Sequence, residues 1–431
     1  MKIEELYKIY KEHPIVCTDT RNISNNSIFF ALKGENFNGN QFAKQALDNG
    51  ASYAIIDDIE FEIKGKTIIV DNVLKTLQLL ANYHRKQFKI PFIGITGTNG
   101  KTTSKELINS VLCQHFNTSF TQGNLNNHIG VPLTILSVKK DCEIAIIEMG
   151  ANHIGEIADL CKIAEPNYGI ITNIGKAHIE GFGSPEGVIK AKSEMYHFIK
   201  NNKGLLFCNH DDDLLMSLSE NINRYTYGAK NANCIASLEN KSPTLKIKWK
   251  DISISSTLYG KYNFYNILLA ICIGDYFKVP NEKIKKGIES YVSSNNRSQF
   301  VQLKNNIDLY LDAYNANPTS MNAAIDSFNS IPSNKKIMIL GDMLELGTTS
   351  NNEHQTIVDK IQHLNIPCLF VGNHFSSVSN KHQFHFFKTN LDLLEWIKEN
   401  DNFSEYQKIL IKGSRGIKLE LISDYLIKKG S

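Results

Sequence analysis

The clearest absences in this sequence are paired cysteines, long apolar runs and a large net charge. None of its eight cysteines stands in a CxxC pair, so neither a disulfide framework nor a zinc site is predicted, and such cysteines are typical of buried positions in a reducing compartment. No stretch approaches the roughly 20 apolar residues that span a bilayer, and residues 1–14 hold no apolar core of signal-peptide length. A net charge of +3 is too small to indicate nucleic-acid binding. We therefore expect a cytoplasmic protein with neither a membrane nor a nucleic-acid partner.

The composition and the apolar pattern predict an α/β protein of more than one domain. Apolar residues make up 42% of the 431 residues and charged residues 21%, which is typical of a globular protein. Domains usually hold about 100–200 residues, so two or three domains are expected. Apolar strands expected at residues 91–96, 142–148, 168–174 and 204–209 alternate with helices, which favours a mostly parallel sheet. Residues 225–255 alternate polar and apolar side chains instead, which favours appended antiparallel strands.

Domain boundaries are expected near residues 87 and 298. A helical stretch at residues 74–89 closes the first segment, and a second set of alternating strands and helices begins after Arg297. The chain is therefore divided into a first α/β domain at residues 1–87, a central domain at 88–298 and a C-terminal domain at 299–431.

The run GITGTNGKTT predicts a phosphate-binding loop between a strand and a helix. The strict P-loop pattern has a glycine where this chain has Ile95, and the part that remains is Gly97-x-x-Gly100-Lys101-Thr102. Glycines let backbone N–H groups crowd around a polyphosphate, and a helix N-terminus favours negative charge. Lys101 would neutralise the β- and γ-phosphates, and the Thr102 hydroxyl would bind magnesium. The alternative is a glycine-rich turn with a solvent-exposed lysine, which does not account for the strand before it and the helix after it.

This loop and further motifs resemble those of the Mur ligases and their folylpolyglutamate synthetase relatives. The loop reads GTNGKTT. The other segments that carry the resemblance are residues 121–134 (TQGNLNNHIGVPLT), 148–156 (EMGANHIGE), 172–178 (TNIGKAH), 190–194 (KAKSE), 312–320 (DAYNANPTS), 340–347 (LGDMLELG) and 412–415 (KGSR). Together they run nearly end to end. They resemble the Mur ligases that join D-alanyl-D-alanine to UDP-N-acetylmuramoyl-tripeptide.

The resemblance implies a monomeric three-domain enzyme of cytoplasmic peptidoglycan synthesis. Its small α/β N-terminal domain would bind the UDP-sugar, its central P-loop-type ATPase-like domain would bind ATP, and its C-terminal domain would be Rossmann-like. ATP would convert a carboxylate to an acyl phosphate, which the amine of the dipeptide then attacks. Two alternatives stay open: another Mur-type or folylpolyglutamate-type ligase, and a nucleotide-binding switch or ATPase that hydrolyses ATP without an acceptor.

The resemblance also implies two magnesium sites and a modified lysine. Glu148, expected at the end of a strand, would bind the magnesium that Thr102 also binds, and His178 would bind a second one. Lys192 matches the lysine that carbon dioxide carbamylates in the family, which turns an ammonium into an oxygen ligand. Lys190 lies about 200° away on the same helix, so only one of the two can face the site. The implied catalytic residues are Lys101, His178 and Lys192. From the residues alone, Lys192 could equally be an exposed lysine paired with a nearby glutamate.

Nucleotide contacts are implied at two places outside the loop itself. Asn266 would contact adenine, in a segment where Tyr262 replaces the usual histidine of the family, and Arg297 would reach across to phosphate. The full set of implied ATP-binding residues is Gly97, Thr98, Asn99, Gly100, Lys101, Thr102, Thr103, Asn266, Arg297 and Asp312.

Substrate contacts are implied in all three domains. The UDP end would be held by Thr20, Arg21, Lys33 and Gly34, the muramoyl-peptide by Asn124, Asn126 and Asn127, and the remaining contacts would come from Tyr314, Asn315, Lys412 and Arg415. A guanidinium suits the carboxylate of the dipeptide because it binds in a bidentate manner. The alternative for the asparagine-rich loop is an ordinary turn, and for Lys412 it is a solvated side chain.

Overall fold

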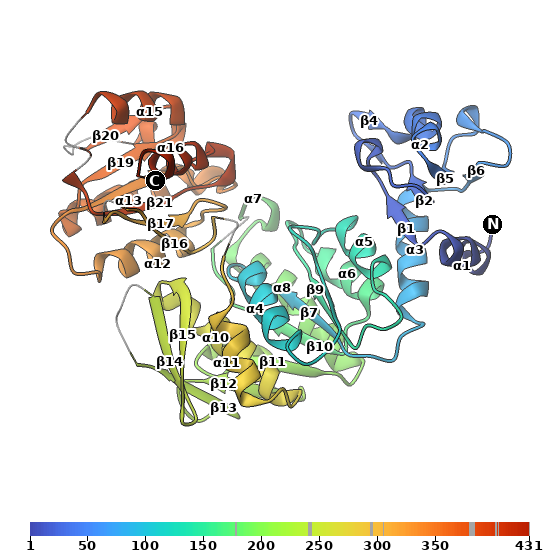
Figure 1. Cartoon of the computed structure of the whole chain (residues 1–431), viewed down its shortest axis with the longest axis horizontal. Helices are drawn as coiled ribbons and strands as arrows, with labels where there is room; N and C mark the ends of the chain where they lie inside the picture. The colour runs from blue at the N-terminus through green and yellow to red at the C-terminus, as the bar shows by residue number, and fades with distance from the viewer. Residues whose placement is uncertain are drawn as a thin grey trace.

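A computed structural model of the chain describes residues 1–176, 179–239, 244–293, 296–304, 306–378, 384–400, 403 and 405–430. Within these residues the strands form a four-stranded, a nine-stranded and a six-stranded sheet, with one additional two-stranded ribbon. Figure 1 shows three lobes, with the N-terminal and C-terminal lobes above opposite ends of the central lobe. No helix in the described part of the chain is both long enough and apolar enough to cross a membrane.

The N-terminal lobe is a small parallel sheet that one long helix connects to the central lobe. The sheet has the order β1-β2-β5-β6. The elements are α1 (Ile3–Glu12), β1 (Ile15–Cys17), β2 (Ser27–Phe30), β3 (Lys33–Gly34), β4 (Phe37–Asn38), α2 (Ala43–Asp48), β5 (Ala51–Ile56), β6 (Thr67–Ile69) and α3 (Val73–Arg85). The side chain of Asn72 accepts a hydrogen bond from the Lys75 backbone N–H at 2.7 Å, which caps the start of α3. Helix α3 then packs on α5 and α6 of the central lobe.

The central lobe is built on a sheet with the order β15-β14-β13-β12-β11-β10-β7-β9-β8. Its elements are β7 (Phe92–Thr96), α4 (Lys101–Leu112), β8 (Thr118–Phe120), α5 (Gly130–Leu136), β9 (Ile144–Glu148), α6 (Glu156–Ala164), β10 (Tyr168–Ile171), α7 (Ile179–Phe182), α8 (Pro185–Asn201), β11 (Leu205–Asn209), α9 (Asp213–Leu218), β12 (Arg224–Gly228), β13 (Cys234–Leu238), β14 (Thr244–Trp249), β15 (Ile252–Tyr259), α10 (Phe264–Tyr276) and α11 (Asn281–Glu289). Strand β7 is apolar except for its last residue and is buried along its whole length, as expected for a parallel strand covered on both faces.

The register of three neighbouring strands brings their carboxyl ends to one edge of this sheet. Ile95 of β7 pairs with Glu148 of β9, and Thr96 pairs with Ile171 of β10. Ligands of open α/β sheets bind at such an edge. The loop after β7 therefore starts beside Glu148.

The C-terminal lobe is a six-stranded sheet with the order β16-β17-β21-β18-β19-β20, parallel except for β16. Its elements are β16 (Gln299–Gln302), β17 (Asp308–Asp312), α12 (Pro318–Asn329), β18 (Lys336–Gly341), α13 (Ser350–Leu364), β19 (Cys368–Val371), α14 (Asn373–Ser377), β20 (His385–Phe387), α15 (Asn390–Glu399), β21 (Lys408–Lys412) and α16 (Glu420–Gly430).

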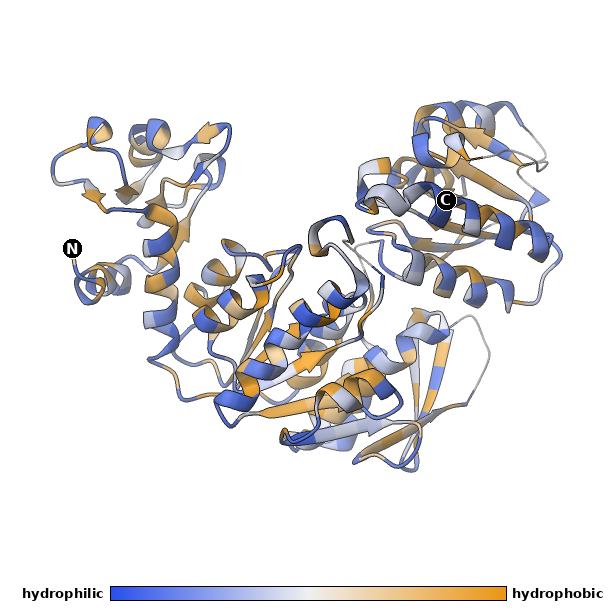
Figure 2. Ribbon diagram, turned by 180° about the vertical axis from the view of Figure 1, so that it is seen from behind, coloured by the Kyte–Doolittle hydropathy of each residue, from blue (hydrophilic) through white to orange (hydrophobic). Residues whose placement is uncertain are grey.

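The hydrophobic core is continuous from the N-terminal lobe into the central lobe. One group of buried side chains extends from Leu6 through Leu77 of α3 to Phe92 at the start of β7. Ile93, the next residue, belongs to a second group on the opposite face of the sheet, as the two-residue period of a strand requires. Two further groups cover the faces of the C-terminal sheet. Figure 2 shows the apolar residues along the central strands and polar residues on the outer turns of the helices.

The mixed α/β architecture with parallel-rich sheets is confirmed, and the expectation of appended antiparallel strands at residues 225–255 is correct in part. That segment begins with β12, which pairs in parallel with both β11 and β13. Only the pairs β13-β14 and β14-β15 are antiparallel. Alternation of polar and apolar residues reports that one face of a strand is exposed, which is common in antiparallel sheets but does not by itself fix the direction of a strand. The short helix α9 makes the crossover that allows β11 and β12 to run in parallel.

Candidate active site

The loop after β7 can adopt its conformation only with glycine at two positions. Gly97 has φ +141° and Gly100 has φ +79°, both in the region that L side chains rarely adopt. A Cβ atom on Gly97 would lie 2.0 Å from the Thr172 hydroxyl, and one on Gly100 would lie 2.6 Å from Oδ1 of Asn266. The glycines therefore let the loop lie directly against the strand-end residues around it.

Residues that follow β10 fix the loop from the other side. The Thr98 backbone N–H donates to the Asn173 carbonyl at 2.9 Å, and the Asn99 backbone N–H donates to the Asn173 side chain at 2.9 Å. The Thr172 hydroxyl donates to the Asn99 carbonyl at 2.6 Å. The loop is thus ordered by hydrogen bonds to residues 172 and 173 before it enters α4.

The Lys101 side chain folds back over its own loop. Its Nζ donates to the carbonyls of Gly97 at 2.5 Å and Thr98 at 3.1 Å. Burial lowers the pKa of Lys101 to about 8, which the charge of Glu148 opposes and the charge of Arg297 assists. The ammonium therefore lies at the loop, where a bound polyphosphate would offer it stronger acceptors than neutral carbonyls.

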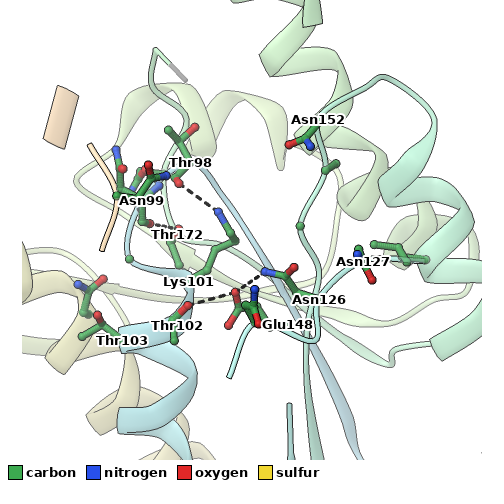
Figure 3. A pocket seen from close by; sticks show the side chains of 18 of the residues that line it. Thr98, Asn99, Lys101, Thr102, Thr103, Asn126, Asn127, Glu148, Asn152 and Thr172 are labelled. Atoms are coloured by element: carbon green, nitrogen blue, oxygen red, sulfur yellow. Dashed lines mark hydrogen bonds between the residues drawn. The ribbon is translucent and has the colours of Figure 1, made fainter. Parts of the chain in front are cut away.

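Glu148 is the buried carboxylate of the site, with 1% of its side chain exposed. Its Oε1 accepts hydrogen bonds from the Thr102 hydroxyl at 3.2 Å and from the Asn126 amide at 2.8 Å, and Figure 3 shows both side chains directed at it. Its Oε2 is buried and has no hydrogen-bond partner among the residues that the structure describes. A buried oxygen of this kind carries a desolvation cost. A carboxylate next to a hydroxyl is an oxygen donor set that fits Mg²⁺.

Lys192 lies on the buried face of α8, and only 2% of it is exposed. Its Nζ lies 3.5 Å from the Ala151 carbonyl and 5.1 Å from the centre of the Phe182 ring. Burial, and to a smaller extent the charge of Lys101, lowers the pKa of Lys192 to about 7. Lys190 is exposed, as the geometry of a helix requires once Lys192 faces inward.

The alternative in which Lys192 is an exposed, ion-paired lysine is therefore wrong. Glu194 uses its carboxylate to accept the backbone N–H groups of Gly155 at 2.7 Å and Ala158 at 2.9 Å, at the start of α6. Lys192 makes no ion pair among the residues described.

The expected second metal ligand, His178, lies outside the described residues. Among the residues that the structure describes, no group of three or more histidine, cysteine, aspartate or glutamate side chains has a metal-binding arrangement.

A cavity of about 1210 Å³ extends from the phosphate loop to both neighbouring lobes. It collects most of the expected site residues from the central and C-terminal lobes. These are Thr98, Asn99, Gly100, Lys101, Thr102, Thr103, Asn124, Asn126, Asn127, Glu148, Asn266, Arg297, Asp312, Tyr314, Asn315 and Lys412. Helix α3 contributes Lys75 and Gln78, which were not expected. Gly97, Lys192 and Arg415 do not line the cavity, although Ala151, the neighbour of Lys192, does.

The expected UDP contacts of the N-terminal lobe, Thr20, Arg21, Lys33 and Gly34, are not brought to this cavity. Arg21 is exposed and pairs with Asp19 at 2.6 Å, and the hydrogen bond from Arg21 lowers the pKa of Asp19 to about 2. Lys33 pairs with Asp57 at 3.0 Å. These residues of the N-terminal lobe thus lie outside the lining of the cavity.

Two strand ends of the C-terminal lobe supply a buried ion pair to the cavity. Asp312 ends β17, Lys412 ends β21, and the two residues are partners in register. The Lys412 ammonium lies 2.6 Å from the Asp312 carboxylate and is 1% exposed, so the alternative of a solvated lysine is wrong. Beside this pair, the Arg297 guanidinium stacks 3.5 Å from the centre of the Tyr314 ring. Arg415 donates to the Tyr314 hydroxyl at 3.4 Å.

The C-terminal lobe contacts the phosphate loop directly through Asn317. Its Oδ1 accepts the Ser320 backbone N–H at 2.9 Å and so caps α12, and its amide Nδ2 donates to Oδ1 of Asn99 at 2.8 Å. Nearby, Lys176 forms an ion pair with Glu353 of α13 at 3.0 Å. These contacts join the two lobes beside the nucleotide loop.

Asn266 lies next to this loop in a buried chain of amides. It accepts a hydrogen bond from the Ser104 hydroxyl at 3.0 Å and donates to Asn263 at 2.8 Å. Asn263 in turn donates to the Tyr259 carbonyl at 2.8 Å, and its side chain does not cap α10. Tyr262 stands where the family resemblance led us to expect histidine. Its hydroxyl forms a hydrogen bond with the Ser298 hydroxyl at 3.1 Å, so it contacts the segment that leads into β16.

Lys105 and Asn173 are site neighbours that the sequence did not predict. Lys105 lies one helical turn after Lys101, and its Nζ lies 3.5 Å from Oε2 of Glu148. The only signal in the sequence is its spacing of four residues from Lys101, which places both side chains on one side of α4.

Comparison with known proteins places the chain in one family. The Mur ligase family catalytic domain matches residues 14–87, the Mur ligase middle domain matches 95–274, and the Mur ligase glutamate ligase domain matches 296–400. The UDP-N-acetylmuramoyl-tripeptide–D-alanyl-D-alanine ligase of Bacillus subtilis is 35% identical over 96% of this chain and 93% of its own length. The ligase of the same name from Escherichia coli is 32% identical over 96% of this chain and 94% of its own length. A crystal structure of MurF from Acinetobacter baumannii is 28% identical and superimposes with a TM-score of 0.86, covering 99% of this chain and 98% of that one. The sequence resemblance is confirmed, and the chain belongs to the Mur ligase family.

Proposed function

We propose that this chain joins D-alanyl-D-alanine to UDP-N-acetylmuramoyl-tripeptide at the expense of ATP, in the synthesis of peptidoglycan precursors. The names and high coverage of the Bacillus subtilis and Escherichia coli relatives support the substrates. The observation that carries the chemistry is Glu148, which lines a cavity that joins the phosphate loop to the C-terminal lobe and whose Oε2 accepts no hydrogen bond from the described residues.

The reaction has to activate a carboxylate, which is a poor electrophile. A carboxylate oxygen of the tripeptide attacks the γ-phosphorus of ATP. The bond between this phosphorus and the oxygen of the departing ADP breaks, and an acyl phosphate forms. The neutral amine of the dipeptide then attacks the acyl carbon, and phosphate leaves with the former carboxylate oxygen while the amine loses a proton. Phosphoryl transfer is catalysed mainly by positioning and by neutralising charge. Lys101 and Arg297, which face the same cavity, suit that task.

Thr102 and Glu148 would hold one magnesium ion. Bound there, the ion would neutralise charge on the phosphate oxygens and help to align them. Asn126 keeps the Glu148 carboxylate oriented by donating to Oε1. Oε2, which accepts no hydrogen bond from the described residues and lies 3.5 Å from the Lys105 ammonium, is proposed as a further ligand atom. His178 is proposed as the ligand of a second ion.

Lys192 is proposed to carry a carbamate. Carbamylation requires a neutral amine that attacks carbon dioxide, after which the nitrogen loses a proton. A buried lysine with its pKa lowered to about 7 and no ion pair in the described structure supports that reaction, because burial favours the neutral amine. The product would place oxygen atoms where the ammonium now lies, next to the Ala151 carbonyl.

The other contacts are proposed by position. ATP would lie along the phosphate loop with its adenine towards Asn266. The muramoyl-peptide would extend from the N-terminal lobe past Asn124, Asn126 and Asn127, and the dipeptide would approach from the C-terminal side. The proposed contacts there are Tyr314, Asn315, Lys412 and Arg415.

Omission of single substrates tests this proposal. With ATP, magnesium, the nucleotide tripeptide and D-alanyl-D-alanine present, we expect one phosphate released for each amide formed, with the product identified by its mass. Without the tripeptide, release should fall to background. Without the dipeptide, it should not exceed one phosphate per enzyme over the same period. Release at an undiminished rate without both substrates would favour a nucleotide switch or a simple ATPase and would overturn the ligase proposal.

A further inference from the structure

Lys105 is a fully buried lysine beside the proposed magnesium carboxylate. Its side chain is 0% exposed, and its Nζ lies 3.5 Å from Oε2 of Glu148. The same Nζ donates to the Gly123 carbonyl at 3.2 Å and lies 5.8 Å from the centre of the Phe120 ring. Neither the motif nor the chemistry described above gives this residue a role.

A buried ammonium is tolerated only when a charge or several hydrogen bonds compensate it. Within the described structure, Glu148 provides the carboxylate that lies within ion-pair distance of Lys105. The two oxygens of Glu148 therefore have different surroundings. Oε1 receives the Thr102 hydroxyl and the Asn126 amide, whereas Oε2 faces the fixed cation.

Lys105 also connects three separate pieces of the site. It belongs to α4, it contacts the end of β9 through Glu148, and it holds the loop between β8 and α5 through Gly123. That loop carries Asn126, which donates to the same carboxylate. Lys105 thus contacts both the Glu148 carboxylate and the loop that carries the hydrogen-bonding partner of that carboxylate.

We propose that Lys105 is a positioning residue that makes cation binding at Glu148 depend on the nucleotide. Lys101 and Lys105 place two cationic side chains beside the single carboxylate of Glu148, and the charge of Arg297 also reaches Lys101, so the site has no net attraction for a free divalent cation. The phosphates of a bound nucleotide make the net charge of the site negative, and the cation then binds between phosphate and carboxylate. This inference rests on the proposed function only in taking Glu148 as a cation ligand.

The test is a titration of the full-length protein with Mn²⁺ in the absence of nucleotide. Binding is measured from the electron paramagnetic resonance signal of the Mn²⁺ that stays free. Removing a unit charge a few ångströms from the carboxylate should change affinity by about tenfold or more, even at an effective dielectric constant near that of a protein surface. We expect Lys105→Met to bind Mn²⁺ at least about tenfold more tightly than the wild type when no nucleotide is present. The difference should shrink when ADP is added. Equal or weaker nucleotide-free binding by Lys105→Met would overturn the proposal.

Two controls separate charge from general damage. Lys408→Met removes a lysine from another ion pair, the one with Asp308 in the C-terminal sheet, and should leave Mn²⁺ affinity unchanged. Lys105→Arg keeps the charge and should bind nucleotide-free Mn²⁺ as weakly as the wild type.

A stability measurement covers the case in which Lys105→Met does not fold. Breaking a buried pair from one side is strongly destabilising, whereas removing both charges is often tolerated. The double variant Lys105→Met, Glu148→Gln should therefore unfold at a higher temperature than Lys105→Met alone. Additive losses would show that the two side chains are not coupled and would contradict the inference. Neither measurement uses the tripeptide or the dipeptide. A failure of the inference about Lys105 is therefore distinct from a failure of the ligase proposal.

Discussion

Lys190 and Lys192 stand two positions apart on α8 and have opposite surroundings. Lys190 is exposed, whereas Lys192 is buried against Ala151 and Phe182. In the sequence both lysines are candidates for the carbamylated residue, and the helix period shows that only one of them can face inward. The motif then selected Lys192, and the structure places that lysine on the buried face.

We expect Lys192→Ala to lower ligation by about 10²–10³-fold, because loss of the proposed carbamate would weaken binding of a magnesium ion, and such an ion supplies several kcal/mol of charge stabilisation in the transition state. Short carboxylates such as formate or acetate should restore part of the rate by occupying the space of the carbamate. Lys190→Ala, a matched truncation on the exposed face, should retain nearly full activity in the same coupled assay. Full activity of Lys192→Ala would remove this lysine from the mechanism.

The carbamate itself has a spectroscopic test. In protein equilibrated with ¹³C-labelled carbon dioxide, we expect one carbamate carbonyl resonance that Lys190→Ala retains and Lys192→Ala lacks. A spectrum in which both variants keep the resonance would place the modification at another lysine.

At the same scale, prediction from sequence fails for Lys105. Its burial arises from β9 and from the loop between β8 and α5, which fold over α4 from distant parts of the chain. A lysine near the start of a helix is usually solvated. No local pattern distinguishes this one, whereas Lys101 and Thr102 belong to a motif whose spacing itself has a physical meaning.

At the scale of elements, the phosphate loop shows why glycine spacing could be predicted while strand direction could not. Gly97 and Gly100 are required by the positive φ and by close approach of Thr172 and Asn266. The glycine pattern therefore reflects the loop backbone directly. The alternation around β12 reflects only which face is exposed, and so it did not reveal that β12 is parallel to β11.

We expect Gly97→Ala to weaken ADP binding by at least about tenfold in calorimetric titration. Backbone strain at positive φ costs about 1–3 kcal/mol, and the new Cβ would also displace Thr172, whose hydroxyl orders the loop. Gly65→Ala is a suitable control, since Gly65 has φ +75° but no atom within 4 Å of the added carbon. That variant should lose a little thermal stability and bind ADP normally. Comparable ADP binding by both variants would contradict this account of the loop.

A second element, the start of α12, has its own prediction. Asn317→Ser keeps an oxygen that can cap α12 but is too short to reach Asn99. The lost hydrogen bond is worth about 0.5–1.5 kcal/mol, so KM for ATP should rise by about 2- to 10-fold while the unfolding temperature changes little. Asn72→Ser makes the same change at the start of α3, where the asparagine side chain accepts from Lys75 within its own helix. An equal rise of KM in both variants, or in neither, would show that the contact between the lobes has no role in nucleotide binding.

At the scale of the whole molecule, the three lobes place different parts of the expected site at different distances from the phosphate loop. The cavity unites residues of the central and C-terminal lobes with α3, whereas Thr20, Arg21, Lys33 and Gly34 of the N-terminal lobe do not line it. The proposed nucleotide-linked substrate would account for both regions if it extends from these residues to the cavity.

Sequence patterns could predict the three-part organisation because each sheet is built from residues close together in the chain. The domain limits at residues 87 and 298, the monomeric state and the cytoplasmic location stay predictions. Contacts between lobes, such as Asn317 with Asn99, could not be predicted, because they join residues that no local pattern relates. The substrate residues of the N-terminal lobe were proposed from motifs alone.

Transfer of oxygen from the tripeptide to phosphate tests the central claim most directly. The terminal carboxylate of the tripeptide is labelled with ¹⁸O at both oxygens, and the released phosphate is analysed by mass spectrometry after ligation to D-alanyl-D-alanine. If the chain activates this carboxylate as an acyl phosphate, each phosphate carries one ¹⁸O atom and each new amide retains one. Unlabelled phosphate, with ATP still consumed, would contradict the account.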